Sequence, residues 1–313
     1  MISQNNTNNY DIIVSQDGTG NYATVQDALN VVPDNSESRT LIFIKKGTYK
    51  EKIILRASKK NVTIIGENVG NVILTYDDYS GKIVGGDTLT TFTSYSFFIQ
   101  ADGFSAENIT FENSAGPVGQ AVAVMVKGDR VIFKNCRFLG HQDTFYTQGV
   151  GRCYLDSCYI EGTTDFIFGS SIVVFNRCIL QSKKNSYITA ASTPEGNKFG
   201  YVFFNCKLTA ADGIDSVYLG RPWRIYAKTV FIECELGNQI KPEGWHNWKK
   251  PEAEKTTFYA EYKCFGAGSL TNNRVEWSRQ LSDIDVAEYT LEKIFAADAS
   301  ATPYKYDWNP FIK

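Results

Sequence analysis

The sequence predicts an all-β protein, a single-domain parallel β-helix, because short strand-like segments recur along most of the chain. Apolar and polar residues alternate within each segment, as in a half-buried strand. Segments that recur every 20 to 28 residues are typical of a fold in which each coil buries itself against its neighbours. The segments centred on cysteine are FKNCRF (133–138), LDSCYI (155–160), FNRCIL (175–180), FFNCKL (203–208) and FIECEL (231–236).

The cysteines of these segments are expected to form a ladder of small apolar groups inside the coils. Their spacings are 22, 20, 28 and 28 residues. Two earlier segments fit the same frame with a branched aliphatic residue, Val62 or Ile109, in place of cysteine. Seven cysteines cannot all pair within one chain, and adjacent ladder positions fall within disulfide range, so the pattern leaves open whether bridges form.

The ends of the chain differ from its middle, as the ends of a repeat protein should. Residues 24–32 predict an amphipathic helix that stops before Pro33 and caps the N-terminal end. Residues 289–297 predict a second helix, followed by an extended tail after Pro303. We expect residues 1–10 to be a disordered or extended leader and residues 11–313 to form the domain.

Composition excludes several classes of protein. The 32 Lys and Arg residues nearly balance 34 Asp and Glu, so the chain lacks the basic stripe of a nucleic-acid binder. No apolar stretch is long enough to span a membrane. With only two histidines and no paired CxxC motif, a zinc site is not expected. The polar N-terminus lacks the layout of a signal peptide, so either the protein is not exported or its signal is absent from this chain.

Two aspartates are the strongest chemical signal. Asp143 and Asp165 lie 22 residues apart, each seven residues after a ladder cysteine. The shared offset predicts that both occupy the same place on successive coils. Two acids held one coil apart can handle a proton or act as a nucleophile, although an isolated Asp in a turn is more often only a turn former.

Five segments then specify a family. GTYKE (47–51), QAVAV (120–124), GHQDTF (140–145), DFIFG (165–169) and LGRPW (219–223) occur in this order. Together they resemble the signature set of pectin methylesterases, carbohydrate esterases of family 8 that remove methyl groups from pectin. His141 and Phe145 depart mildly from the family pattern. The resemblance implies a right-handed parallel β-helix with a shallow groove on its outer face and no metal or organic cofactor.

The resemblance also implies roles for five residues. Asp165 resembles the nucleophile and Asp143 the general acid and base. Gln120 and Gln142 resemble the amides of the oxyanion hole, and Arg221 resembles the cation that orients Asp165. Mutual repulsion of two acids, with a cation beside one of them, would keep Asp165 charged and Asp143 protonated.

Aromatic residues near these motifs are expected to contact sugar rings. Trp223 and Trp248 are the main candidates, whereas Trp245 and Phe166 could equally pack inside the protein, and Tyr146 follows the GHQDTF segment. His141 could tune a nearby carboxylate, but a structural histidine is an equal alternative.

The sequence therefore predicts a pectinesterase acting on pectin, homogalacturonan or oligogalacturonides. It would be secreted or in the cell envelope, would bind neither nucleic acid nor membrane, and would work as a monomer. A pectin-cleaving glycosidase or lyase on the same scaffold, or a non-catalytic β-helix protein that binds cell-wall polymer, are the rival hypotheses. A glycosidase would not need two glutamine amides beside its acids, and a calcium-dependent lyase would want clustered acidic ligands.

Overall fold

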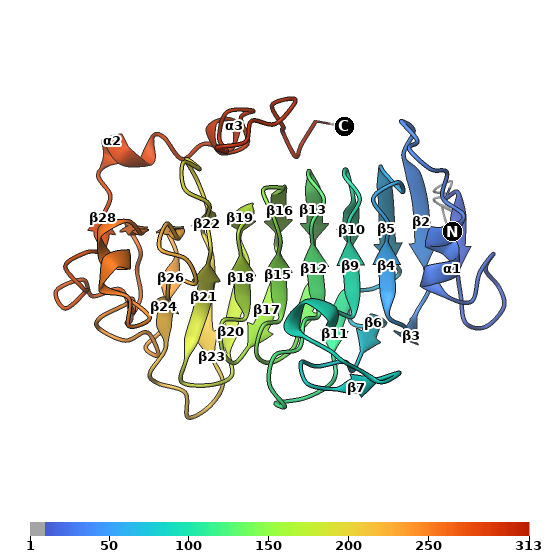
Figure 1. The fold of residues 1–313 in the computed structure, drawn as a ribbon, viewed down its shortest axis with the longest axis horizontal. Helices are drawn as coiled ribbons and strands as arrows, with labels where there is room; N and C mark the ends of the chain where they lie inside the picture. The colour runs from blue at the N-terminus through green and yellow to red at the C-terminus, as the bar shows by residue number, and fades with distance from the viewer. Residues whose placement is uncertain (1–9, 313) are drawn as a thin grey trace, which may run out of the picture.

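The computed structural model describes residues 10–312, and in it the chain winds into an elongated stack of coils (Figure 1). Each full coil contributes one strand to each of three long sheets, and all strand pairs in these sheets are parallel. The predicted all-β parallel β-helix is confirmed. The predicted leader, apart from residue 10, lies outside the described residues.

The first sheet has eleven strands and runs the length of the stack. In spatial order its strands are β1 (Ile12–Val14), β2 (Thr40–Ile44), β5 (Val62–Gly66), β10 (Ser105–Glu107), β13 (Val131–Lys134), β16 (Arg152–Asp156), β19 (Ile172–Asn176), β22 (Tyr201–Phe204), β25 (Lys228–Ile232), β27 (Phe258–Tyr262) and β28 (Arg279–Gln280).

The second sheet has eight strands. In spatial order they are β26 (Glu235–Leu236), β23 (Lys207–Ala210), β20 (Ile179–Ser182), β17 (Tyr159–Gly162), β14 (Arg137–Leu139), β11 (Thr110–Asn113), β6 (Val72–Tyr76) and β3 (Gly47–Lys50).

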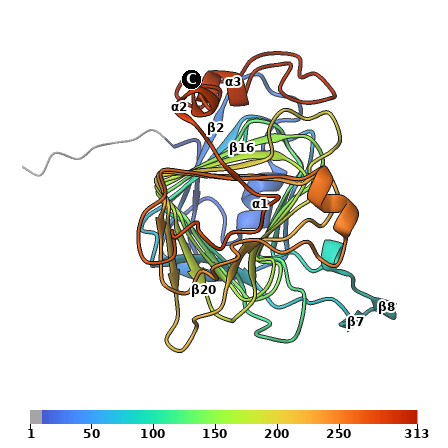
Figure 2. The ribbon, with the colours of Figure 1, turned by 90° about the vertical axis from the view of Figure 1, so that its left-hand side faces the viewer.

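The third sheet has seven strands and carries the functional site on its outer face. Its strands are β24 (Tyr218–Gly220), β21 (Tyr187–Ala191), β18 (Ile167–Gly169), β15 (Phe145–Thr147), β12 (Val124–Val126), β9 (Phe97–Ile99) and β4 (Ile53–Leu55). Between β6 and β9 the chain leaves the stack as an antiparallel hairpin, β7 (Ile83–Val84) and β8 (Asp87–Thr88), which projects from the body (Figure 2). A short 3-10 helix, η1 (Thr91–Thr93), leads the chain back to the third sheet.

One left-handed residue turns the chain from the first sheet into the second on each coil. Its φ lies between 45° and 58°, a conformation that L-residues adopt only as single positions in turns. The residue that follows then points its side chain inward. These turn residues are Asn108, Asn135, Ser157, Arg177, Asn205, Glu233 and Lys263.

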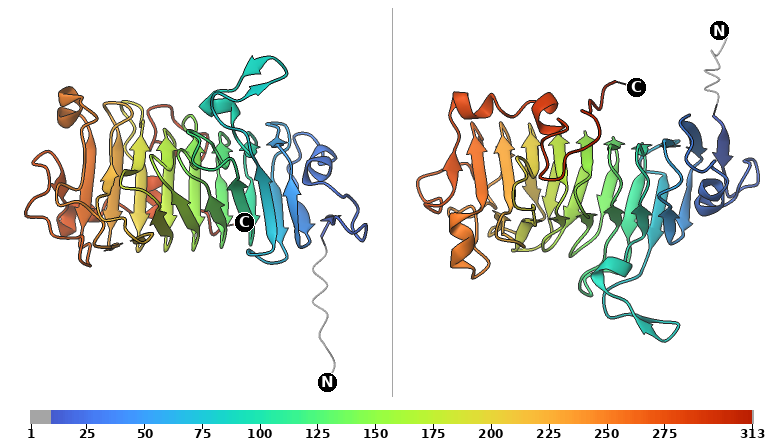
Figure 3. Two further views of the ribbon diagram at one scale, coloured as in Figure 1. Left: turned by 90° about the horizontal axis from the view of Figure 1, so that it is seen from below. Right: turned by 45° about the horizontal axis from the view of Figure 1, so that its top comes forward.

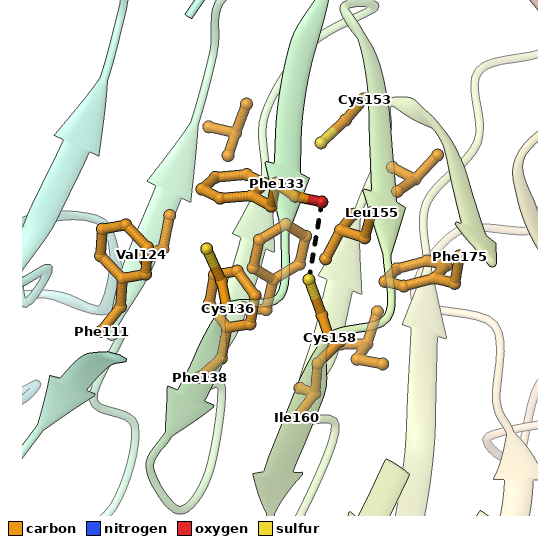
Figure 4. Packing of buried hydrophobic residues seen from close by; sticks show 14 of the residues in the cluster. Phe111, Val124, Phe133, Cys136, Phe138, Cys153, Leu155, Cys158, Ile160 and Phe175 are labelled. Carbon is orange, nitrogen blue, oxygen red and sulfur yellow. Dashed lines mark hydrogen bonds between the residues drawn. The ribbon is translucent and has the colours of Figure 1, made fainter. Parts of the chain in front are cut away.

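The residues after these turns form the predicted cysteine ladder. Each ladder thiol lies 3.4–3.8 Å from a backbone carbonyl oxygen of the preceding coil; the Sγ of Cys158, for example, is 3.6 Å from the carbonyl oxygen of Phe133 (Figure 4). All seven cysteines are free thiols, so no disulfide staples the coils. Cys264 extends the ladder by one coil beyond the predicted set.

The ladder position predicted for Ile109 is confirmed, whereas the ladder position predicted for Val62 is wrong. Ile109 directly precedes Thr110, which pairs with Arg137, so it is level with Cys136. Val62 instead begins β5 in the first sheet, level with Val131, because Thr63 and Ile132 both pair with Ser105. The two segments look alike because both follow a left-handed asparagine, Asn61 or Asn108, but these turns lie at different corners of the coil.

Both predicted terminal helices are present, and both are shorter than the expected ranges 24–32 and 289–297. α1 (Val25–Asn30) begins after the cap Thr24, whose hydroxyl accepts a hydrogen bond from the Asp27 N–H, and it buries Val25, Ala28 and Leu29. At the other end, α3 (Leu291–Ile294) makes little more than one turn, and α2 (Asp283–Val286) precedes it. A further 3-10 helix, η2 (Pro251–Lys255), lies between β26 and β27.

Tertiary contacts explain why α3 ends early. The carbonyl of Phe295 accepts a hydrogen bond from the fully buried Arg152 at 2.7 Å, instead of continuing a helix. Arg152 also binds Asp129 and stacks 4.0 Å from the ring centroid of Tyr304. The segment with α2 and α3 crosses over the strands of the first sheet (Figures 1 and 3) and covers its outward apolar row, which includes Tyr154, Val174, Val202, Val230 and Ala260. Within the described residues, no helix has the length and apolar character needed to cross a membrane.

A buried ion pair closes the C-terminal end of the core. Phe175, Phe203 and Phe231 stack at 4.3 and 4.4 Å between ring centroids, and the next residue in this register is Glu261. Glu261 is 1% exposed, and it binds Arg274 through two contacts of 2.8 and 3.1 Å. Arg274 also donates to backbone carbonyls of the neighbouring loop, so its donors are used at the point where the aromatic stack ends.

We predict that Arg274→Ala lowers the free energy of unfolding by about 3–5 kcal/mol, because it leaves the Glu261 carboxylate buried without its partner. Arg177→Ala is the matched control, since Arg177 also pairs with a carboxylate, that of Asp156, but its side chain is 61% exposed. Its loss should cost less than about 1 kcal/mol. Chemical denaturation of both variants measures the difference, and equal losses would contradict the role of the buried pair.

Candidate active site

A cavity of about 180 Å³ opens on the outer face of the third sheet. The chain enters this sheet from the second sheet at a corner, and both glutamines and both aspartates of the lining come from that corner on successive coils. Strands β18 and β21 contribute Phe168 and Ala190, and the segments before β9 and after β24 supply the remaining walls. The lining residues are Thr91, Phe92, Gln120, Gln142, Asp143, Asp165, Phe168, Ala190, Arg221, Trp223 and Trp248.

Asp143 and Asp165 occupy equivalent places on adjacent coils, as the 22-residue spacing predicted. Phe145 pairs with Ile167 in the sheet, which sets the two aspartates level with each other. Both have left-handed backbones, with φ of 69° and 51°. Asp adopts this conformation at single positions in turns, as other residues do at the corner between the first and second sheets. The same kind of turn on both coils therefore presents both carboxyl groups to the cavity.

The two glutamines are also stacked on adjacent coils. Gln120 and Gln142 form a parallel bridge, and the Ala121 N–H donates to the Gln142 carbonyl at 3.0 Å. Gln142 directly precedes Asp143, and the turn at Asp143 allows consecutive residues to face the same cavity. The amides thus lie on the coils that precede and carry the first aspartate.

Arg221 binds both carboxylate oxygens of Asp165. Its Nε donates to Oδ1 at 2.9 Å and its Nη2 donates to Oδ2 at 2.6 Å. The guanidinium lies between two rings, 3.6 Å from the centroid of Trp248 and 4.0 Å from that of Tyr187. This sandwich fixes the plane of the guanidinium and so the orientation of Asp165.

Burial and charge set the two carboxyl groups apart. Burial raises the pKa of Asp165 above its usual value, and the hydrogen bonds and charge of Arg221 oppose that rise. The pKa of Asp143 is raised well above its usual value, first by burial and then by the charge of Asp165. Arg221 and the Gln120 amide oppose the rise at Asp143 less effectively. Asp165 is therefore the more acidic of the pair, and Asp143 keeps its proton to higher pH.

Aromatic rings form the wall beside the acids. Phe168 stacks on Tyr146 with 4.4 Å between centroids, and Trp223 lies 5.9 Å from Phe168. Phe92 of η1 faces Trp223 at 6.4 Å, with an interplanar angle of 19°. Trp223 and Trp248 line the cavity as the sequence predicted, whereas Tyr146 is 5% exposed, lies beside Phe168 in the sheet and contacts Phe92 at 5.5 Å between centroids.

Besides Tyr146, two predicted contact residues do not line the cavity. Phe166 is fully buried in the core, because the left-handed turn at Asp165 directs the following ring inward, where Gly162 makes room for it. Trp245 is also buried and stacks 4.3 Å from Tyr259. Both rings therefore pack inside the protein, which was the alternative reading of each.

His141 lies apart from the acid pair. It lines a separate cavity together with Glu161 and Lys183, and burial and then Lys183 lower its pKa. This position gives no contact with Asp143, but the hydrogen bond expected of a structural histidine is also missing, because among the described residues the buried Nδ1 of His141 has no partner.

Several residues of the site were missed by sequence reasoning. Alternation along β18 signals Phe168, since Ile167 faces the core and the next residue faces outward. Thr91 and Phe92 belong to the excursion between β6 and β9, and no periodic signal marks them. Tyr187 stands 34 residues before Arg221, so only the stacking of coils brings its ring to the guanidinium. Among residues 10–312, no group of three or more His, Cys, Asp or Glu side chains is arranged to hold a metal ion.

The fold and the cavity define a parallel β-helix protein with a pair of unlike carboxyl groups, and comparison with known proteins adds a family. A family model described as Pectinesterase matches residues 11–298. Pectinesterase 31 of Arabidopsis thaliana is 40% identical over 283 residues, covering 88% of this chain and 89% of that protein. Other curated relatives are longer, and the chain spans 53% of a pectinesterase/pectinesterase inhibitor of Prunus persica at 40% identity.

Solved structures agree with this similarity. A pectin methylesterase from carrot superposes with a TM-score of 0.86 at 30% identity, covering 96% of this chain and 99% of that one. A pectin methylesterase in complex with a hexasaccharide gives 0.84 at 28% identity, with coverage of 97% and 99%. The chain belongs to the pectinesterase family, whose reaction is the hydrolysis of a carboxylic ester.

We predict that Arg221→Gln raises the pKa of both carboxyl groups, and that of Asp165 more, because the removed cation touches Asp165 directly. Carboxyl ¹³C NMR titration of aspartate-labelled protein measures the shifts. Asp298, whose pKa is lowered by its pairing with Lys198 away from the site, is the internal control and should not move. An unchanged pKa at Asp165 would show that burial alone sets it.

Proposed function

We propose that the protein hydrolyses methyl esters of galacturonate units in pectin, with Asp165 as nucleophile, Asp143 as acid and base, and Gln120 and Gln142 as the oxyanion hole. The observation that carries the proposal is the arrangement of unlike acids. Arg221 binds Asp165 by two hydrogen bonds, whereas Asp143, in register on the preceding coil, has the higher pKa. Two acids of unequal pKa are what a nucleophile and a proton donor need.

The first step is attack by Asp165. One carboxylate oxygen forms a bond to the carbonyl carbon of the ester, and the π electrons of the C=O bond move onto its oxygen. The bidentate contact with Arg221 keeps Asp165 ionised and leaves its attacking direction fixed. Because Asp165 is buried, few water molecules must be displaced before attack.

The oxyanion that forms needs hydrogen-bond donors. Gln120 and Gln142 line the same cavity as both acids, and their side-chain NH₂ groups are the candidate donors. They come from stacked positions held by backbone hydrogen bonds, so little reorganisation is needed as charge develops.

Asp143 completes the reaction by moving one proton twice. As the tetrahedral intermediate collapses, the C–O bond to the methoxy group breaks and Asp143 donates its proton to give methanol. An anhydride of Asp165 remains. Asp143, now charged, accepts a proton from water as that water attacks the anhydride, which releases the galacturonate carboxylic acid and restores both aspartates. The balance is one ester and one water in, one acid and one methanol out.

The surroundings suit a polymer with sugar rings. The cavity lies on the outer face of the β-helix, and the rings of Phe92, Trp223 and Trp248 in its lining are the candidates to contact sugar rings. The hexasaccharide found in a related pectin methylesterase supports homogalacturonan or its oligogalacturonides as substrates. A polymer of this kind implies a secreted or cell-envelope enzyme, and an open groove on one chain can act as a monomer.

One experiment separates this function from cleavage of the polymer. The protein is incubated with methylated pectin, and methanol, chain length and unsaturated product are measured. Methanol release with unchanged chain length supports the esterase. Chain shortening without methanol would instead indicate a glycosidase or lyase, and neither product would indicate a binding protein.

Asp165→Ala should abolish methanol release, because the variant has no carboxylate to attack the ester. Asp143→Asn should also be severely impaired, since an amide can neither donate the proton nor activate water. Asp212→Ala, an exposed aspartate outside the cavity, is the control and should leave the rate unchanged. Circular dichroism verifies each fold, and near-normal activity of Asp165→Ala would refute the nucleophile.

Gln142→Ala and Gln120→Ala should each lower kcat by about 10²–10³-fold with little change in KM, because an oxyanion donor acts in the transition state. Steady-state kinetics on a methylated oligogalacturonide separates the two parameters. A rise in KM at constant kcat would show that the amides only bind substrate.

A further inference from the structure

The loop of residues 244–250 packs against the catalytic arginine in an unusual conformation. Trp248 and Lys249 both have φ of 56°, two consecutive non-glycine residues in the left-handed region. L-residues visit this region as single positions and pay a steric cost at each one. Surrounding contacts must therefore hold the turn in place.

Side chains of the same loop supply those contacts. The Trp248 N–H donates to Nδ1 of His246 at 3.0 Å, and the Lys249 N–H donates to Oδ1 of Asn247 at 2.9 Å. Asn247 is itself fixed by Glu254 of η2, to which its Nδ2 donates at 2.6 Å. His246 and Asn247 thus each accept a hydrogen bond from one backbone N–H of the turn.

The turn matters because of what Trp248 touches. Its ring lies 3.6 Å from the Arg221 guanidinium, whose opposite face is covered by Tyr187 at 4.0 Å. Without Trp248 the guanidinium would have a ring on one face only, and it could swing away from Asp165. The position of the Trp248 backbone is therefore linked to the ion pair of the site.

His246 is anchored where it can act as a fixed acceptor. The backbone N–H of His246 donates to the carbonyl of Gly220, the residue before Arg221, at 3.1 Å. Its ring lies against Tyr187 and Tyr218, at 5.5 and 5.3 Å between centroids. The imidazole therefore has little freedom to turn Nδ1 away from Trp248.

We infer that His246 is a positioning residue for the pectinesterase site: its neutral imidazole accepts the Trp248 N–H, holds Trp248 on Arg221 and so keeps Arg221 on Asp165. This inference rests on the proposed function, since it assigns His246 to the orientation of the proposed nucleophile. His246 itself is not among the residues that line the cavity.

The neutral form of His246 is favoured by its surroundings. Burial lowers its pKa, and the charges of Arg221 and Lys249 lower it further. Tyr187 and Tyr218 also face the imidazole of His246. The Nζ of Lys241 lies 5.1 Å from the centroid of the Tyr218 ring. Because the folded pKa is depressed, the contact is present at neutral pH and is lost as pH falls through the folded pKa, when Nδ1 acquires a proton and can no longer accept.

Histidine NMR tests the contact without any assay of activity. The chain has only two histidines, so replacing His246 assigns both signals, with His141 as the reference. We expect the unaltered protein at pH 7 to show His246 as the Nε2–H tautomer with an unprotonated, hydrogen-bonded Nδ1. An Nδ1–H tautomer would overturn the inference.

A pair of variants tests the link to catalysis. His246→Asn places an amide oxygen near the position of Nδ1 and cannot titrate, whereas His246→Gln places its oxygen farther out, nearer the position of Nε2. At pH 7 we expect His246→Asn to keep kcat/KM within about threefold, and His246→Gln to lose about tenfold, the effect of one hydrogen bond. Thermal unfolding of each variant verifies that the fold persists.

The pH profile is the readout that a merely structural role would not move. In the unaltered protein the acid limb of kcat/KM should reflect two groups, Asp165 and His246, and in His246→Asn it should become shallower, reflecting Asp165 alone. Superimposable profiles for the unaltered protein and both variants would overturn this inference while leaving the esterase intact. If the unaltered protein releases no methanol, the proposed function fails instead, and this role fails with it.

Discussion

The backbone register between coils is the constraint on which the rest of the structure depends. Parallel pairing holds equivalent residues of successive coils about 4.8 Å apart, so a residue's position in the coil decides its neighbours. Asp143 and Asp165 become neighbours because Phe145 pairs with Ile167. The two glutamines become neighbours because a parallel bridge joins the coil of Asp143 to the coil before it. The same register stacks phenylalanines and thiols inside. One repeated interaction therefore produces both the core and the site.

Within that register, burial and the charge of Arg221 have opposite effects on the pKa of the two aspartates. Burial disfavours charge on both aspartates, and Arg221 restores it mainly to the one it touches. The aromatic sandwich around Arg221 explains how a flexible side chain can do this reliably. Tyr187 comes from β21 and Trp248 from a loop far along the chain, so the acidity of Asp165 depends on coils that follow it.

Sequence reasoning succeeded where the repeat itself carries the information. The fold class, the inward cysteines and the level of the two acids all follow from spacing and alternation. It failed where turn geometry or a remote partner decides the position of a residue. The left-handed turn at Asp165 sends Phe166 inward, and Val62 follows a different corner from Ile109 although their segments read alike. Phe92 lies on an excursion with no period, and α3 stops where Arg152 takes the Phe295 carbonyl. Such features depend on partners remote in sequence.

The ladder of free thiols has a consequence for how the chain must fold. Six of the seven cysteines are buried in the native state, with only Cys264 partly accessible, so oxidants have little access to them. The unfolded chain has no such protection, and in an oxidising medium its thiols could pair in many combinations, none of which the native coils use. In such a medium the coils must therefore form faster than disulfide bonds. The yield of folded protein depends on the relative rates of coil formation and thiol oxidation, which compete before the native state forms.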